Sequence, residues 1–367
     1  MSRPPLSRLR SSLAELKAYR VPPEPPPIKL DANESPWPLP EDARRTLAEA
    51  LAALPLHRYP DGLARGLRSA LAAHLDAPEE GLLLGVGSDE CITMLYGGLA
   101  KPGPSGEAVV LFPGPTFVMY AHTARAHGLV PVEVPLADDW TLDPEAMHAA
   151  LERHRPNLVF YASPNNPTGN AFDPETIRAL ADAHPETLHV VDEAYGPFHR
   201  DRPEEPAKTL RPWVAERPQV AVMSTLSKCG LAGARLGWLY ADPAFVAELE
   251  KVRQPFNLNA LTQEAARLAL TDLAPVIEEQ LRAIVRERAV LRGALEAIEG
   301  LHVWPSDANF LLVRVPGDAV ALRERLWAEG IAVRVFASHP RLAGHLRLTV
   351  GTPDENAALV DALRRAL

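Results

Sequence analysis

Cysteine is scarce in this chain of 367 residues, which contains only Cys91 and Cys229. Two cysteines cannot build a disulfide framework, and no spacing of Cys and His is typical of a zinc site. We therefore expect a reducing compartment and no bound metal. Each cysteine is better explained as a small buried residue than as a nucleophile.

Long apolar runs and an excess of basic residues are also missing. No run approaches the roughly 18 apolar residues that a membrane-spanning helix needs, and the first residues lack the apolar core of a signal peptide. The formal net charge is −9, with no basic stripe for nucleic acid. We expect a soluble, cytoplasmic protein that binds neither a membrane nor nucleic acid.

The hydrophobic pattern predicts an α/β fold. Hydrophobic residues make up 47% of the chain, enough for a sizeable core. Short β-branched apolar runs alternate with helical patterns, which predicts a mostly parallel seven-stranded sheet sandwiched by helices. The seven strands are predicted near residues 82–85, 108–112, 130–134, 157–162, 187–192, 220–224 and 235–240.

The pattern changes near residue 258, where long helices are predicted at about 258–270 and 275–299. The rest of the chain alternates strands and helices and predicts a smaller α+β domain. A proline-rich stretch at 21–27 precedes the first extended segment and can form neither a helix nor a sheet ladder. We predict an N-terminal arm at 1–44, a large domain at 45–265 and a small C-terminal domain at 266–367.

Lys228 follows the apolar run 219–223 and lies in a stretch of small residues that ends at Arg235. A lysine at a strand end with little bulk around it can be a desolvated amine that forms a Schiff base with a carbonyl. An exposed loop lysine is the ordinary alternative. The segments 163–169 and 190–195, each placed at a strand end, favour the chemical interpretation.

The segment from Gly85 to Glu90 joins a predicted strand to a predicted helix. Its glycines permit a tight turn, and the free N–H groups of a helix N-terminus suit a phosphate. A plain capped helix explains it about as well. Glu90 replaces the third glycine of the dinucleotide fingerprint, which disfavours a dinucleotide-dependent oxidoreductase. An ATPase is disfavoured because no Gly-x-x-x-x-Gly-Lys loop exists.

One cofactor, pyridoxal 5′-phosphate, accounts for these segments together. Its aldehyde needs the amine of Lys228, and its ring nitrogen needs the carboxylate of Asp192. The ring needs a flat neighbour, Phe117. Asn166 and Tyr195 are candidate donors to the ring oxygen. The candidate partners of the phosphate are Gly87, Ser88, Asp89, Ser227 and Arg235. All fall at the carboxyl ends of predicted strands, where open α/β sheets bind ligands.

The order of four motifs resembles the fold-type I pyridoxal-phosphate aminotransferases. These motifs are Ser-Pro-Asn-Asn-Pro-Thr-Gly at 163–169, Val-Asp-Glu-Ala-Tyr at 191–195, Leu-Ser-Lys at 226–228 and Leu-Ala-Gly-x-Arg at 231–235. More narrowly, the segments 30–36, 58–60 and 346–352 resemble the histidinol-phosphate aminotransferase family. The resemblance extends from about Asp31 to the C-terminus.

The resemblance implies roles for the cofactor partners. Lys228 would form the Schiff base and then shuttle a proton. Asp192 would pair with the ring nitrogen, and Asn166 and Tyr195 with the ring oxygen. Ser88 and Asp89, through their backbone, would hold the phosphate together with Ser227 and Arg235. Tyr59 would reach that phosphate from a second subunit, which makes a homodimer necessary for activity.

Substrate residues are also implied by the resemblance. Arg347 would bind the substrate's anionic group, assisted by Arg334, for which a solvated cation at a strand end is the equal alternative. Tyr19 and Asn33 would lie over the substrate, or simply pack as part of an N-terminal arm. Phe117 and Phe256 stand where relatives commonly have Tyr, and the spacing from Lys228 to Arg235 is one residue shorter than usual.

The implied activity is an exchange of an amino group between L-histidinol phosphate and 2-oxoglutarate, which gives imidazole acetol phosphate and L-glutamate in histidine biosynthesis. The route is ping-pong through the Schiff base on Lys228. An aromatic amino-acid aminotransferase or a threonine-phosphate decarboxylase would share every cofactor residue. A regulator of the same fold is disfavoured, because only some 30 proline-rich residues precede the matching region.

Overall fold

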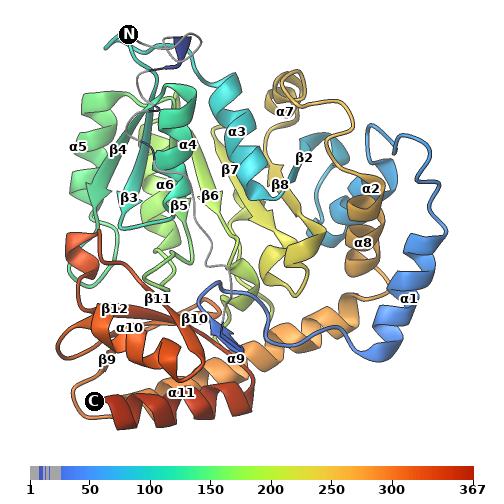
Figure 1. Ribbon diagram of the computed structural model, residues 1–367. Helices are drawn as coiled ribbons and strands as arrows, with labels where there is room; N and C mark the ends of the chain where they lie inside the picture. Colours follow the sequence, from blue (N-terminus) through green and yellow to red (C-terminus); the bar gives the residue numbers. More distant parts are fainter. Residues whose placement is uncertain (1–7, 11–12, 14–15, 17–25) are drawn as a thin grey trace.

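The structure is a computed structural model that describes residues 8–10, 13, 16 and 26–367, and its strands form two separate sheets (Figure 1). The larger sheet has seven strands in the order β2-β8-β7-β6-β5-β3-β4. Its strands are β2 (Leu82–Val86), β3 (Val109–Gly114), β4 (Val130–Pro135), β5 (Leu158–Ala162), β6 (Leu188–Asp192), β7 (Val220–Thr225) and β8 (Leu236–Tyr240).

This sheet is mostly parallel, as predicted. Strands β3 to β7 pair in parallel, and β8 runs antiparallel to both β2 and β7. All seven predicted strands are confirmed to within two residues at each end. Every residue of β5, β6 and β7 is buried, which explains why their sequences are continuous apolar runs rather than alternating ones.

Helices cover both faces of the large sheet, so that neighbouring residues of one strand belong to different cores. Val190 packs in the core under α3 (Ser88–Gly98), α4 (Met119–His127) and α7 (Pro243–Leu249). Val191 packs in the core on the opposite face. The helices on that face are α2 (Arg65–Leu75), α5 (Pro144–His154), α6 (Pro174–Ala183) and α8 (Ala260–Leu270).

The smaller sheet has the order β1-β11-β12-β10-β9. Its strands are β1 (Ile28–Leu30), β9 (His302–Val303), β10 (Phe310–Arg314), β11 (Ile331–Val335) and β12 (His345–Thr349), and it is accompanied by α9 (Ala274–Glu296), α10 (Ala319–Ala328) and α11 (Pro353–Ala366). Figure 1 shows β1, from the start of the described chain, beside the strands of the C-terminal part, and it pairs in parallel with β11. The chain therefore crosses from the small sheet, through α1 (Glu41–Ala52), into the large one.

Short 3-10 turns complete the described fold. They are η3 (Glu79–Gly81), η4 (Gly196–Phe198), η5 (Arg211–Trp213), η6 (Leu226–Lys228), η7 (Ala232–Ala234) and η8 (Pro340–Leu342). Most of the predicted proline-rich stretch lies outside the described residues. Within the described ranges no helix is both long and apolar enough to cross a membrane. The two predicted boundaries between the three parts, at 44/45 and 265/266, stay predictions.

Candidate functional site

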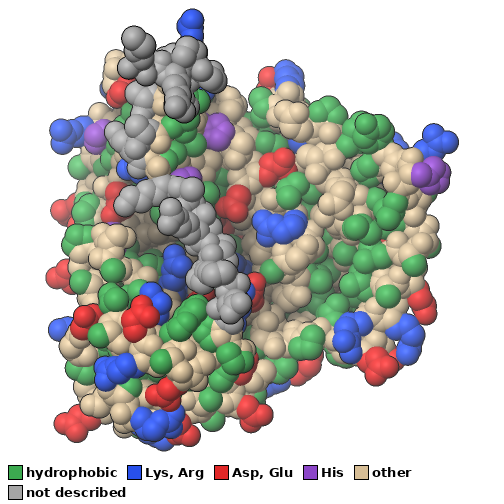
Figure 2. Space-filling model, in the orientation of Figure 1, with side chains coloured by type: hydrophobic (Ala, Val, Ile, Leu, Met, Phe, Trp, Pro, Cys, Tyr) green, Lys and Arg blue, Asp and Glu red, His purple; other side chains and the backbone are tan. Residues whose placement is uncertain are grey.

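A cavity of about 230 Å³ opens where β5, β6 and β7 end. Figure 2 shows that this face of the molecule is hollowed, with Lys and Arg side chains around the hollow. Nine of the predicted site residues line the cavity: Ser88, Asp89, Phe117, Asn166, Asp192, Tyr195, Ser227, Lys228 and Arg235. They come from segments up to 147 residues apart in sequence (88 to 235), and the sheet brings them together.

Lys228 is the last residue of η6, directly after β7. The turn is held by Thr225, whose hydroxyl accepts the Ser227 N–H at 3.1 Å and donates to the carbonyl of Leu236 at 2.7 Å. The Lys228 Nζ lies 5.7 Å from the centroid of the Tyr195 ring. The amine therefore lies near the end of β7, beside the aromatic ring of Tyr195.

An anion-binding cradle forms where α3 begins. Gly87 has a φ of +73°, and a Cβ there would lie 2.5 Å from Nη2 of Arg235, so only glycine leaves space for that guanidinium. Nη1 of Arg235 donates to the Ser227 hydroxyl at 3.3 Å. A cation, two serine hydroxyls and the N-terminal end of an eleven-residue helix meet here. This arrangement suits a phosphate, and the short spacing from Lys228 still brings Arg235 to the cavity.

Asp192 ends β6 and is 5% exposed. Its Oδ2 accepts the Tyr120 O–H at 2.7 Å and its Oδ1 accepts the Ala194 N–H at 3.0 Å. Burial raises the pKa of the Asp192 carboxyl to about 6, although both hydrogen bonds act to lower it. Because burial disfavours the ionised form, a cationic N–H group placed beside Asp192 in the cavity would stabilise its carboxylate.

Tyr120 was missed by the sequence interpretation. It lines the same cavity, and its ring meets that of Phe117 edge to face, with centroids 5.6 Å apart. Tyr120 is the second residue of α4, and Phe117 lies three residues before it, just ahead of the helix. That spacing was the available signal, but the contact with Asp192, 72 residues later, depends on the fold.

Arg347 of the small sheet and Asn33, which follows β1, hydrogen-bond to residues that line this cavity. The Asn33 amide donates to the Tyr195 hydroxyl at 2.8 Å. Arg347 in β12 donates to Asn166 Oδ1 at 2.6 Å and to the carbonyl of Asp31 at 2.5 Å. Arg347 is only 7% exposed, so it is buried rather than on the surface. The structure thus brings Asn33 and Arg347 together with Asn166 and Tyr195.

Tyr59 and Arg334 neither line the cavity nor hydrogen-bond to a residue that lines it in the described contacts. Tyr59 is 82% exposed, and its ring stacks on Phe256 with centroids 4.7 Å apart. Arg334 is exposed on β11 directly opposite Arg347, so the two side chains share one face of the sheet. Tyr19 lies outside the described residues. Among the residues that the structure does describe, no group of three or more His, Cys, Asp and Glu is placed to hold a metal ion.

Comparisons with known proteins agree with this geometry. The family model "Aminotransferase class I and II" matches residues 25–363. The chain is 46% identical to a histidinol-phosphate aminotransferase of Chromobacterium violaceum, over 97% of each chain. It is 44% identical to histidinol-phosphate aminotransferase 1 of Burkholderia lata, over 99% of each. The solved structure of the histidinol-phosphate aminotransferase of Sinorhizobium meliloti in complex with pyridoxal-5′-phosphate matches with a TM-score of 0.86 and 27% identity, over 98% of this chain and 97% of that one.

Proposed function

Because this chain belongs to the class I and II aminotransferases, we propose that it transfers an amino group between L-histidinol phosphate and 2-oxoglutarate with the help of pyridoxal 5′-phosphate. The products are imidazole acetol phosphate and L-glutamate, as in histidine biosynthesis. The observation that supports this most is the single cavity that holds Lys228, Asp192 and a phosphate cradle together.

The residues present fit the cofactor. Gly87 leaves the space for the Arg235 guanidinium that a phosphate requires, and Ser88, Asp89 and Ser227 complete that cradle. Asp192 lines the same cavity and would pair with the ring nitrogen, and Asn166 and Tyr195 would donate to the ring oxygen. Phe117 would stack on the ring. When bound, pyridoxal 5′-phosphate supplies an electrophilic aldehyde carbon and a ring that accepts electron density.

Asp192 keeps a proton on the ring nitrogen. Its buried carboxylate is poorly solvated, so a cationic N–H partner relieves the cost of its charge. Tyr120 and Ala194 hold both carboxylate oxygens in place, so that Asp192 keeps one orientation while its partner changes.

Lys228 performs the proton transfer. Its Nζ would bond to the cofactor's aldehyde carbon and would give up that bond to the substrate's amine. The amine set free would carry a proton between the substrate's amine-bearing carbon and the aldehyde carbon. The hydrogen bonds of Thr225 hold the backbone of the turn that carries Lys228.

Arg347 binds the anionic end of each substrate. Its guanidinium lies 5.3 Å from the centroid of the Phe310 ring and 5.7 Å from that of Phe336, in a place where little water competes. The phosphate of histidinol phosphate and a carboxylate of 2-oxoglutarate or glutamate can take this position in turn. Arg334, on the same sheet face, adds a second cation. Asn33 and Tyr19 remain candidates for contacts over the substrate.

A homodimer with shared active sites accounts for the exposed apolar face that carries Tyr59. The exposed large apolar side chains of this face are Leu56, Tyr59, Leu63, Phe256 and Leu261. Such a group of exposed apolar side chains is typical of a protein interface. In this assembly the hydroxyl of Tyr59 reaches the phosphate cradle of the other subunit.

We place the enzyme in the cytoplasm and divide it into an arm at 1–44, a large domain at 45–265 and a small domain at 266–367.

A half-reaction panel tests the substrate. The cofactor-loaded enzyme is mixed separately with histidinol phosphate, phenylalanine, tyrosine and threonine phosphate, and the loss of cofactor absorbance is followed by stopped flow. Histidinol phosphate should react at least about tenfold faster than the others, since only it combines the phosphate with the imidazole amine. Faster reaction with phenylalanine or tyrosine would point to an aromatic amino-acid aminotransferase, and carbon dioxide release from threonine phosphate to a decarboxylase.

A further inference from the structure

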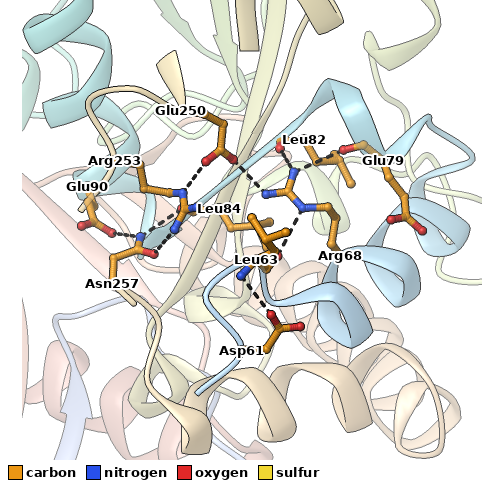
Figure 3. Close-up of polar contacts among 10 residues, drawn as sticks. All are labelled: Asp61, Leu63, Arg68, Glu79, Leu82, Leu84, Glu90, Glu250, Arg253 and Asn257. Atoms are coloured by element: carbon orange, nitrogen blue, oxygen red, sulfur yellow. Dashed lines mark hydrogen bonds and ion pairs between the residues drawn. The ribbon is translucent and has the colours of Figure 1, made fainter. Parts of the chain in front are cut away.

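A chain of polar side chains runs from α2 to the start of α3 (Figure 3). We call this chain of Arg68, Glu250, Arg253, Asn257 and Glu90 the polar link. None of these five residues lines the active-site cavity, and the chemistry described above uses none of them.

At the cradle, the link ends on Glu90, the third residue of α3. Its Oε2 accepts the Val86 N–H at 2.5 Å and the Asn257 Nδ2 at 2.8 Å. The same Asn257 nitrogen donates to the carbonyl of Leu84 at 3.2 Å. Because Val86 directly precedes Gly87 and Ser88, the position of the Glu90 carboxylate sets the backbone from which the cradle is built.

At the other end, the link is anchored on α2. Arg68 binds Glu250 Oε1 at 2.9 Å, and Arg253 binds Glu250 Oε2 at 2.6 Å. Arg253 then donates to Asn257 Oδ1 at 3.0 Å. The side chains of Arg68, Glu250 and Arg253 are only 11% to 25% exposed, so these charges are weakly screened by water. The amide of Asn257 is thereby oriented, with its oxygen on Arg253 and its nitrogen on Glu90.

Phe256 couples this link to the exposed face. It has a φ of +57°, a left-handed conformation that a bulky residue rarely adopts, and it lies between the two linked residues Arg253 and Asn257. Its ring is 42% exposed and stacks on Tyr59. A partner surface that covers Tyr59 and Phe256 therefore acts on the same short loop that holds Asn257 against Glu90.

We propose that Asn257 and Glu90 are positioning residues that couple subunit association to binding of the cofactor's phosphate. Covering the Tyr59–Phe256 face orders the loop 253–257, Asn257 holds the Glu90 carboxylate on Val86, and the cradle is set before the phosphate arrives. Because each dimer binds two cofactors, linkage requires that saturating cofactor tighten the dimer by the square of the factor by which dimerisation tightens cofactor binding at each site. This inference rests on the proposed function, which supplies both the cofactor and the dimer.

The test measures this coupling factor directly. The dissociation constant of the dimer is determined by analytical ultracentrifugation without and with saturating pyridoxal 5′-phosphate, and the ratio of the two values is the coupling factor. The cofactor's own dissociation constant, measured by absorbance at low and high protein concentration, must change by the square root of this ratio, because two cofactors bind per dimer. The ³¹P chemical shift of the bound cofactor reports the environment of its phosphate in the cradle, independently of activity.

Four variants and one control separate positioning from general stability. Asn257→Asp keeps the acceptor for Arg253 but places a second carboxylate against Glu90, so the coupling factor should fall about tenfold and the ³¹P signal should move. Asn257→Ala should show a similar loss. Glu90→Gln keeps an acceptor for both donors and should change the factor by about threefold or less. Glu296→Gln, at an ion pair with Arg292 at the end of α9, should leave it unchanged.

The double variant Glu90→Gln with Asn257→Asp gives the decisive comparison. The new amide can donate to the new carboxylate, so the double variant should recover much of the coupling that Asn257→Asp loses. An unchanged coupling factor in Asn257→Asp would overturn the inference, as would a double variant no better than that single one. If the unaltered protein bound no pyridoxal 5′-phosphate, or formed no dimer, the proposed function itself would be wrong.

Discussion

Replacing Asp192 by Asn should stabilise the cofactor-free protein while weakening cofactor binding. Burial raises the pKa of Asp192 from 3.8 to about 6. The folded protein therefore holds a proton that the unfolded chain has already lost between those two values, and stability falls as the pH rises through this window. A shift of about two units at about 1.4 kcal/mol each corresponds to a free-energy cost of about 3 kcal/mol above pH 7.

The variant removes this cost because an amide does not ionise. Asn can still accept the Ala194 N–H, and its NH₂ can donate to the Tyr120 hydroxyl. We expect the free energy of unfolding of the cofactor-free protein to rise by about 3 kcal/mol at pH 7.5 and by about half of that at pH 5. Urea unfolding at matched protein concentration measures both values.

A matched control is Asp182→Asn. The ion pair with Arg217 holds the pKa of that exposed carboxyl below its usual range, so its contribution has the opposite sign and the variant should gain no stability at pH 7.5. The claim is that ionisation of the buried Asp192 carboxyl lowers the stability of the cofactor-free protein. A loss of stability in Asp192→Asn, or a gain of the same size at pH 5 and pH 7.5, would refute it.

Three further changes probe other parts of the site. Tyr120→Phe removes a hydrogen bond to the Asp192 carboxylate, so the pKa of Asp192 should rise further and the cofactor's dissociation constant should increase about tenfold, as a titration by absorbance would show. Arg347→Ala should lower kcat/KM for histidinol phosphate by about 10² or more through a higher KM, and steady-state kinetics with an effect confined to kcat would argue against a binding role. Lys228→Ala should retain the cofactor without a covalent bond and lose turnover; measurable turnover in this variant would contradict the assignment of the amine.

The sequence predicted the strands well and the contacts between distant segments poorly. Strands such as β6 and β7 are apolar on both sides because both faces of the sheet are covered, and this leaves a pattern that a single sequence shows. The two-residue strand β9 leaves no such pattern. The pairing of β1 with β11 joins positions about 300 residues apart and has no local signal either.

The same distinction applies to the site. Lys228, Asp192 and Asn166 could be proposed from the sequence because each lies at or shortly after the end of a recognisable strand and carries a distinctive side chain. Tyr120 could not be predicted, since its role depends on the hydrogen bond from its hydroxyl to the buried carboxylate of Asp192, which only the fold brings together. The bond from Asn33 to Tyr195 and the link from Asn257 to Glu90 also depend on how loops fold against one another. Residues that orient other residues are harder to predict from a sequence than residues that take part in the reaction.

Identification of the lysine that binds the cofactor tests the central claim most directly. The loaded protein is reduced with borohydride, which makes the carbon–nitrogen bond permanent, and is digested and sequenced by mass spectrometry. The reduced cofactor should be found on the Nζ of Lys228 alone, at close to one per chain. A label on Lys29, Lys101, Lys208 or Lys251 instead, or an unlabelled protein that is fully active, would contradict the account.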